Sequence, residues 1–140
     1  MRLEPLYRVE FSYPEHYHVD AADSLHVYFA VGRCEGLISG RFRGVNHPRH
    51  RDDDVFLPDF QGVIETDDDA VVWFDYRGFG RPRGDGLREI VGTAVHQCER
   101  EPYSRLNASA CVLAGETRRV AERFVIALEI AELVWEPLPE

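Results

Sequence analysis

Lysine is missing from this sequence of 140 residues, and all 16 basic side chains are arginine. This absence excludes mechanisms that need a lysine amine, such as Schiff-base formation, pyridoxal phosphate chemistry and the P-loop. Cysteine is scarce as well, since the three cysteines are far apart and form no CxxC pair. We therefore expect neither a disulfide framework nor a zinc knuckle, but reduced and buried thiols in a cytoplasmic protein.

The sequence also lacks long apolar runs and an excess of positive charge. No stretch approaches the roughly 20 apolar residues of a membrane span, and the first ten residues contain no signal-peptide-like segment. The net charge is -9, whereas proteins that bind nucleic acid usually carry a basic face. We expect no nucleic-acid partner and no membrane partner. The length fits one domain, residues 1–140, large enough for its own core.

What the sequence does contain is alternation of apolar and polar residues with a period of two, which is typical of half-buried strands. The alternation of Phe124, Ile126, Leu128 and Ile130 favours a strand over a helix in the one ambiguous segment. Strands are predicted over residues 3–13, 25–31, 37–42, 55–66, 70–79, 87–98, 108–114 and 121–134. The sequence thus predicts an all-β fold, a single closed antiparallel β-barrel of about eight strands.

Two turns are predicted between these strands. Three consecutive aspartates, residues 67–69, are expected to form a tight acidic turn, and residues 115–117 are expected to close the last hairpin.

Three segments carry a resemblance to a known family. They are LEPLYRVEF at residues 3–11, GVIETDDDAVVWFDYRGFG at residues 62–80, and YSRLNASACVLAGE at residues 103–116, followed by a closing strand. The chain resembles the bacterial family called domain of unknown function 3237. The resemblance implies a closed antiparallel barrel similar to that of allene oxide cyclase, and it implies no particular chemistry because the function of the family is not established.

The chain departs from the family pattern at three positions. Arg105 stands where members often have tryptophan before a Leu-Asn pair. Val91 and Gln97 stand near the places of an arginine and an acidic residue on the strand at residues 87–98. If that charged pair binds a ligand in other members, the ligand of this chain is expected to differ.

The interior of a barrel of about eight strands holds packed side chains or one small ligand, so inward polar residues are the informative ones. The sequence predicts that Trp73, Asp75 and Arg77 face inward and that His96 joins them from another strand. Arg77, oriented by Asp75, would hold a carboxylate or enolate oxygen, and His96 would act as a general base. The alternative for this strand is the opposite orientation, with Phe74 and Tyr76 inside and Asp75 and Arg77 as a solvated surface pair. The alternative for His96 is a structural histidine.

Further candidates for ligand binding are Tyr76, Glu65, Asn107 and Glu129. The two glutamates would be buried acids with raised pKa values, and Asn107 beside Tyr103 would be a hydrogen-bond donor to an oxyanion. For the glutamates the alternative is simple exposure to water. For Asn107 it is an ordinary role in a turn.

Two histidine-rich segments contain residue types that can bind a metal ion. The first contains His16 and His18, followed by Asp20, Asp23 and His26, and the second runs through residues 47–54. Neither spacing matches a specific motif, and Arg49 and Arg51 in the second segment would repel a cation. The second segment is predicted to be an exposed loop. We expect no metal and no other cofactor.

The sequence therefore predicts a pocket for a small, mostly apolar, oxygenated organic molecule. Any activity would be cofactor-independent isomerase, cyclase or lyase chemistry. The alternatives are a non-catalytic carrier or sensor with the same pocket, and a structural barrel that dimerises. A homo-oligomer, most simply a homodimer, is expected.

Overall fold

The computed structural model describes residues 1–20 and 25–140, and antiparallel strands dominate this part of the chain. One short 3-10 helix, η1 (Tyr103–Ala108), follows the eighth strand. The strands are β1 (Arg2–Val19), β2 (Leu25–Gly36), β3 (Gly40–Asn46), β4 (Arg49–His50), β5 (Phe56–Leu57), β6 (Asp59–Thr66), β7 (Val71–Gly84), β8 (Leu87–Gln97), β9 (Cys111–Val120) and β10 (Arg123–Val134). No helix in the described ranges is long and apolar enough to cross a membrane.

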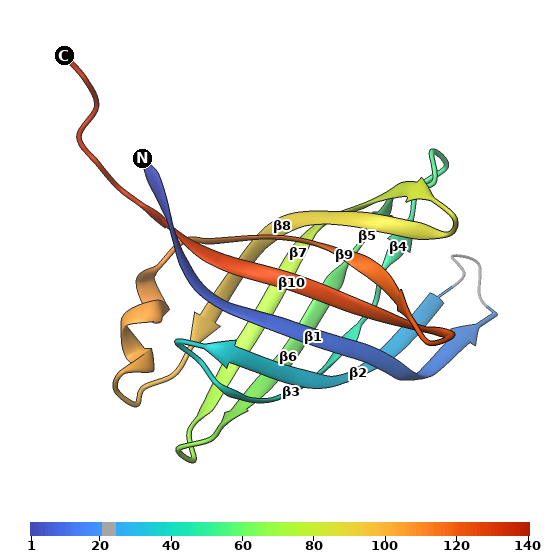
Figure 1. Cartoon of the computed structure of the whole chain (residues 1–140), viewed down its shortest axis with the longest axis horizontal. Coiled ribbons are helices and arrows are strands. Elements are labelled where there is room, and N and C mark those ends of the chain that lie inside the picture. The colour runs from blue at the N-terminus through green and yellow to red at the C-terminus, as the bar shows by residue number, and fades with distance from the viewer. Residues whose placement is uncertain (21–24) are drawn as a thin grey trace.

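Eight of the strands form a ring. Their order is β7-β6-β3-β2-β1-β10-β9-β8, and β8 pairs again with β7, so that the first and last members of the series are neighbours. Figure 1 shows these strands curving around a common interior, with the short strands β4 and β5 beside one end of β7. The all-β prediction is confirmed, and the arrangement is barrel-like.

The alternation predicted for β1 holds in the middle of the strand. Tyr7, Val9 and Phe11 are buried inside the ring, as expected from their shared face. Leu3, placed on the same face by the sequence, is instead 58% exposed. The pairing of β1 with β10 shifts register between Pro5 and Tyr7, and such an irregularity changes which residues point inward.

Of the two faces of strand β2, the one with the smaller side chains is buried. Phe29 and Val31 lie on the outside, whereas Ala30 and Cys34 are buried. The reason is lack of space, because a side chain at Gly32 would collide with the backbone and Cβ of Phe11 on the adjacent strand. The larger rings of β1 and its neighbours already fill the interior at this level.

The two predicted turns have different outcomes. Residues 67–69 do form the turn between β6 and β7, and the hydroxyl of Thr66 accepts a hydrogen bond of 2.8 Å from the amide of Ala70. The last hairpin instead turns at Ala121 and Glu122, which have φ values of 51° and 69°. Gly115 lies within β9, where its missing side chain lets the carbonyl of Ala127 approach closely.

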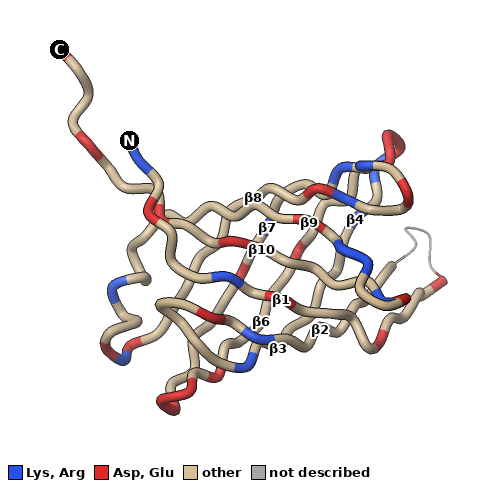
Figure 2. Tube along the Cα trace, viewed as in Figure 1, with Lys and Arg blue, Asp and Glu red and all other residues tan. Residues whose placement is uncertain are grey.

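Charged side chains lie mainly on the outside of the ring and at the hairpin ends. Figure 2 shows acidic and basic residues interspersed along the trace in this view, without a continuous basic stripe. Many form exposed pairs, such as Arg33 with Asp67 at 2.6 Å and Arg41 with Glu65 at 2.8 Å.

Candidate functional site

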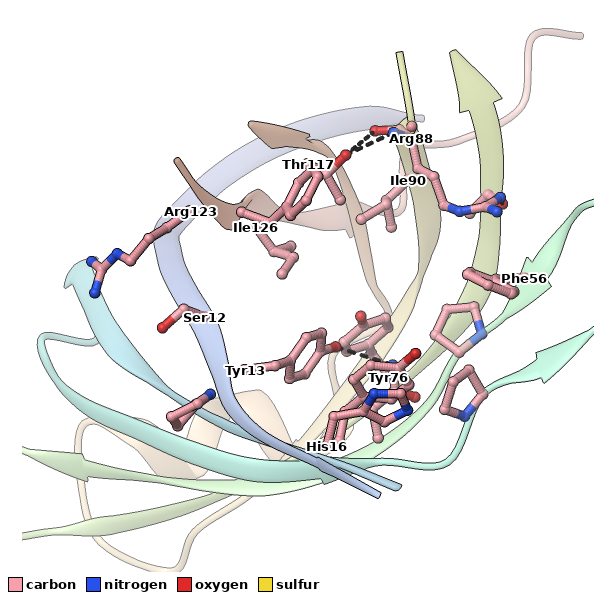
Figure 3. Close-up of a pocket in the computed structure, with 18 residues that line it drawn as sticks. Ser12, Tyr13, His16, Phe56, Tyr76, Arg88, Ile90, Thr117, Arg123 and Ile126 are labelled. Carbon is pink, nitrogen blue, oxygen red and sulfur yellow. Dashed lines mark hydrogen bonds between the residues drawn. The ribbon is translucent and has the colours of Figure 1, made fainter. Parts of the chain in front are cut away.

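An open cavity of about 610 Å³ lies at the end of the ring where β8 begins and β10 begins. Figure 3 shows side chains from both sides of the ring facing this space. Its lining is largely aromatic and aliphatic, with important contributions from Tyr13, Tyr28, Phe56, Tyr76, Ile90 and Ile126. A concave, mostly apolar surface of this size, with few polar groups, is typical of a small-molecule site.

Two polar side chains that line the cavity, those of Tyr13 and Asn46, are hydrogen-bonded to each other. The amide nitrogen of Asn46 donates a hydrogen bond of 3.0 Å to the hydroxyl oxygen of Tyr13. The amide oxygen of Asn46 accepts a hydrogen bond of 3.0 Å from the backbone amide of Asp59. Since both ends of the Asn46 amide are engaged, its orientation is set, and the Tyr13 hydroxyl keeps its own hydrogen to donate.

The tyrosines of the cavity are neutral hydrogen-bonding groups. Burial raises the pKa of Tyr13, against the opposing effect of its hydrogen bonds with Asn46 and Tyr76. Burial likewise raises the pKa of Tyr76 well above its ordinary value, and it raises that of Tyr28 to a smaller extent. All three phenols therefore stay protonated near neutral pH, so the cavity offers hydroxyl donors rather than phenolates.

A stack of rings forms one side of the cavity mouth. The ring of His16 lies flat on that of Tyr28, with centroids 4.0 Å apart and an interplanar angle of 4°. Nε2 of His16 is 3.1 Å from Nδ1 of His26, and His18 stacks on the other side of His26 at 4.5 Å. Of these three histidines, His16 is the one that lines the cavity.

Arg88 stands on the wall contributed by β8. Its guanidinium lies over the ring of Phe56, 3.8 Å from the centroid, and its side chain is 17% exposed. It donates to the carbonyl oxygen of Gly80 at 2.9 Å, to the carbonyl oxygen of Asp54 at 2.7 Å, and to the Asp54 carboxylate at 3.0 Å. The guanidinium is therefore held in place before any ligand arrives.

The predicted inward placement of Trp73, Asp75 and Arg77 is wrong. The interior side of β7 carries Phe74 and Tyr76 instead, both almost fully buried. Trp73 is 39% exposed, and the side chain of Arg77 is 65% exposed and paired with Asp59 at 3.2 Å. The physical reason is that the more uniformly apolar face of a strand gains more free energy from burial, and this gain outweighs the partial exposure of one tryptophan.

His96 faces the interior, as the sequence predicts, but it lies apart from the other predicted catalytic residues. It is 1% exposed, and its Nε2 is 2.6 Å from the hydroxyl of Tyr7. Its ring packs against Phe74, with centroids 5.5 Å apart. His96 is not among the residues that line the cavity, so it does not combine with Asp75 and Arg77 in one site.

Three of the predicted ligand-binding residues lie on the outer surface. Glu65 pairs with Arg41 across neighbouring strands, and Glu129 is exposed between two buried residues of β10. They point outward because strand alternation gives the interior to their apolar neighbours. Asn107 uses both ends of its amide on the backbone of Cys98, at 2.8 and 2.9 Å. It fixes a loop and has no remaining amide group directed at a ligand.

Tyr76 differs from these residues, because it does line the cavity. Tyr103, the predicted neighbour of Asn107, donates a hydrogen bond of 2.9 Å to Asp68. It lies in η1, which follows the end of β8, whereas the cavity lies where β8 begins.

The candidate metal segments do not form a coordination site in the described part of the chain. No group of three or more potential ligands is arranged to hold a metal ion in residues 1–20 and 25–140. Asp23, a member of the first segment, lies outside the described residues. In the second segment His50 pairs with Asp54 at 2.8 Å, and both side chains are exposed as predicted. The segment is not wholly a loop, because Arg49 and His50 form β4 and pair with β5.

Sequence reasoning missed Asn46, Arg88 and His16 as members of a shared pocket. Tyr13 shares one strand face with Tyr7, Val9 and Phe11 by alternation, and this was the available signal for one half of the polar pair. The other residues come from β3, β8 and the distal part of β1, and local alternation does not indicate which strands are neighbours.

No protein-family model and no curated protein matches the chain. Several solved structures share its fold. A β-barrel-like protein from Acinetobacter baumannii is 18% identical with a TM-score of 0.77, and the match covers 94% of each chain. A protein of unknown function from Clostridium acetobutylicum is 13% identical with a TM-score of 0.81, covering 96% of this chain and all of the other.

An enzyme from Penicillium herquei is also similar in structure. It is 18% identical with a TM-score of 0.61, and the match covers 92% of this chain and 93% of the enzyme. At these identities the likeness concerns the fold alone, and the architecture is that of uncharacterised barrel-like proteins.

Proposed function

We propose that the protein binds a small, mostly apolar, oxygenated organic molecule in the cavity at the open end of a closed strand barrel. The observation that carries this proposal is the combination of aromatic walls with one fixed polar pair, Tyr13 and Asn46. The walls favour binding by burying the apolar surface of a ligand in any orientation, whereas the hydroxyl of Tyr13 selects a ligand oxygen. Because this hydroxyl is protonated, the matching ligand atom is an acceptor such as a carbonyl or hydroxyl oxygen.

The proposal is tested by filling the cavity. Ile126 is buried and lines the cavity, so Ile126→Trp inserts an indole into the space. Val31 is 41% exposed on β2, and Val31→Trp adds the same side chain on the outside as a matched control. We expect saturable binding of 2-naphthol, followed by its fluorescence, to be lost in Ile126→Trp and retained in Val31→Trp. Circular dichroism checks that both variants fold.

Equal binding of 2-naphthol by the wild type and the folded Ile126→Trp variant would place the ligand elsewhere and overturn the proposal. Tyr13→Phe provides a finer test, since it removes one hydroxyl and leaves the ring. We expect it to weaken binding by about 1 kcal/mol, the typical contribution of one neutral hydrogen bond.

A second candidate function is cofactor-independent acid–base chemistry on the bound molecule, as in an isomerase, cyclase or lyase. It is favoured by His16, whose ring lines the same cavity as the neutral hydroxyl of Tyr13. An imidazole near a ligand can remove a proton next to a carbonyl group while a phenol stabilises the resulting enolate oxygen. Burial raises the pKa of all three tyrosines, however. Their pKa values are therefore not shifted in opposite directions, as those of an acid–base pair are, and this favours a carrier or sensor.

Deuterium exchange separates these two functions. Incubating the protein with 2-tetralone in heavy water measures proton removal next to the carbonyl. An enzyme accelerates this exchange and loses the effect in His16→Gln, whereas a carrier binds the ketone without accelerating exchange.

We further propose that the chain belongs to the domain of unknown function 3237 family, acts in the cytoplasm and forms a homodimer. Trp73, Val71 and Val95 support dimerisation because they leave apolar surface exposed on β7 and β8. Light scattering of the wild type and of Trp73→Arg tests it. We expect a dimer that the substitution converts to a monomer.

A further inference from the structure

The charge of the cavity is opposite to that of the whole chain. The chain carries 25 acidic and 16 basic residues, yet the described residues that line the cavity include two arginines and no aspartate or glutamate. The two arginines are Arg88 and Arg123, and Figure 3 shows the guanidinium of Arg123 extending away from the cavity. Arg88 is therefore the cation to consider in a cavity with apolar walls.

Arg88 retains hydrogen-bonding capacity after its contacts with the protein. Its Nη1 donates to two carbonyl oxygens, and its Nη2 donates to the carboxylate of Asp54. A guanidinium has five N–H groups, so two remain, one on Nε and one on Nη2, that have no partner among the described residues. Two N–H groups of one guanidinium can bind a carboxylate through both of its oxygens.

Tyr28 and His16 contribute polar groups to the same mouth from β2 and β1. The charge of Arg88 acts on Tyr28, where it opposes the increase in pKa that burial causes. The Tyr28 phenol is a neutral donor, and its ring is held by the stack with His16. An anion at the mouth would thus meet a fixed guanidinium and a neutral hydroxyl, with the Asp54 carboxylate as a negative charge that already contacts the guanidinium.

We propose that the ligand is a ring-containing organic acid, bound with its carboxylate at the mouth beside Arg88 and with its second oxygen at the Tyr13 hydroxyl. This inference rests on the proposed binding function and adds the chemical class of the ligand. The aromatic walls between the two polar ends take the ring system, and a cavity of about 610 Å³ is large enough for a ligand of two or more fused rings.

Asp54 makes the proposal testable in both directions, because its carboxylate competes with a ligand carboxylate for Arg88. Its side chain is 58% exposed and also contacts His50 at 2.8 Å. Asp54→Asn removes the competing charge and leaves the backbone carbonyl that holds Arg88 unchanged. Asparagine also tolerates the positive φ of 63° at this position, so the substitution suits the local backbone.

The experiment compares 6-hydroxy-2-naphthoic acid with its uncharged primary amide by fluorescence titration at neutral pH and low salt. We expect Arg88→Gln to weaken binding of the acid by about tenfold to a hundredfold, as for a lost charged hydrogen bond, and to change binding of the amide much less. Asp54→Asn is expected to strengthen binding of the acid severalfold. Arg81→Gln removes an equal charge from the outer face, where Arg81 pairs with Glu89 at 2.9 Å, and is the matched control.

Two failures can be told apart. If neither compound binds saturably to the wild type, or if Ile126→Trp leaves their binding unchanged, the proposed cavity function itself fails. If both compounds bind in the cavity with equal affinity and neither Arg88→Gln nor Asp54→Asn changes their ratio, the ligand is not an acid, and this inference alone is overturned. Asp54→Asn keeps the test valid if Arg88→Gln does not fold.

Discussion

The hydroxyl of Tyr7 lies 2.6 Å from Nε2 of His96 inside the strand ring. Both side chains are buried, and Nδ1 of His96 has no hydrogen-bond partner among the described residues. Burial lowers the pKa of His96 from 6.5 to about 4, because the charged imidazolium would lose its hydration without gaining an ion pair. The pair is a neutral contact within the core, and its energetic consequence appears when the pH falls.

The first prediction concerns this pH dependence. Between about pH 6.5 and pH 4 the unfolded chain binds a proton at His96 and the folded chain does not, so the free energy of unfolding decreases as the pH falls. The difference between the two pKa values corresponds to about 3 kcal/mol, at roughly 1.4 kcal/mol per pH unit. Urea unfolding across this window should show the loss in the wild type.

His96→Gln should flatten this dependence, because the amide does not titrate and can still bond to Tyr7. His47→Gln is the control, since His47 is exposed and its substitution should preserve the slope. An unchanged slope in His96→Gln would show that other groups cause the acid sensitivity.

The second prediction concerns the thiols. Burial raises the pKa of Cys34 to about 12 and that of Cys111 to about 11, and both side chains are almost completely inaccessible. Cys98 is only partly buried. Since the thiolate is the reactive form, a thiol reagent such as dithionitrobenzoate should label about one cysteine in the native protein and all three after denaturation. Rapid labelling of Cys34, located by mass spectrometry, would contradict the buried placement.

The third prediction concerns Arg77, which lies on the outer face of β7. Arg77→Ala should leave the affinity for 2-naphthol unchanged, because the side chain does not line the cavity. Its ion pair with Asp59 is exposed, so we expect a loss of stability below about 1 kcal/mol. Titration and denaturant unfolding of the variant measure both quantities. A clear loss of ligand affinity would show that Arg77 contributes to the ligand site and would contradict this prediction.

The fourth prediction concerns the hairpin between β9 and β10. Ala121 and Glu122 both adopt positive φ values, which cost free energy for residues with a side chain other than asparagine or aspartate. Replacing the pair with Asn-Gly supplies the residues that such a two-residue turn favours, and it should stabilise the protein by about 1 kcal/mol. A rise in the midpoint of thermal unfolding checks this. A decrease would indicate that Ala121 or Glu122 makes a contact that the turn preference does not offset.

The strands themselves could be predicted from the sequence because the signal is local. In β10 the alternation of Phe124, Ile126, Leu128 and Ile130 with other residues has the period of a strand, whatever the strand packs against. The acidic turn at residues 67–69 was also predictable, since runs of short polar residues are typical of turns. The turn at Ala121 was not, because its residues carry no preference for the positive φ that neighbouring strands impose.

Only the tertiary structure decided which residues form the candidate site. On β7 both faces carry an aromatic residue, so alternation alone left Trp73 and Phe74 as alternatives, and packing against the rest of the interior selected Phe74. Tyr13, Asn46 and Arg88 are far apart in the chain and meet because β1, β3 and β8 take particular places around the ring. The sequence by itself determined an all-β chain and the approximate places of most strands, but not the extent of β9, the last turn or the short strands β4 and β5. Strand order and register, which depend on contacts between distant residues, determined the cavity and its chemistry.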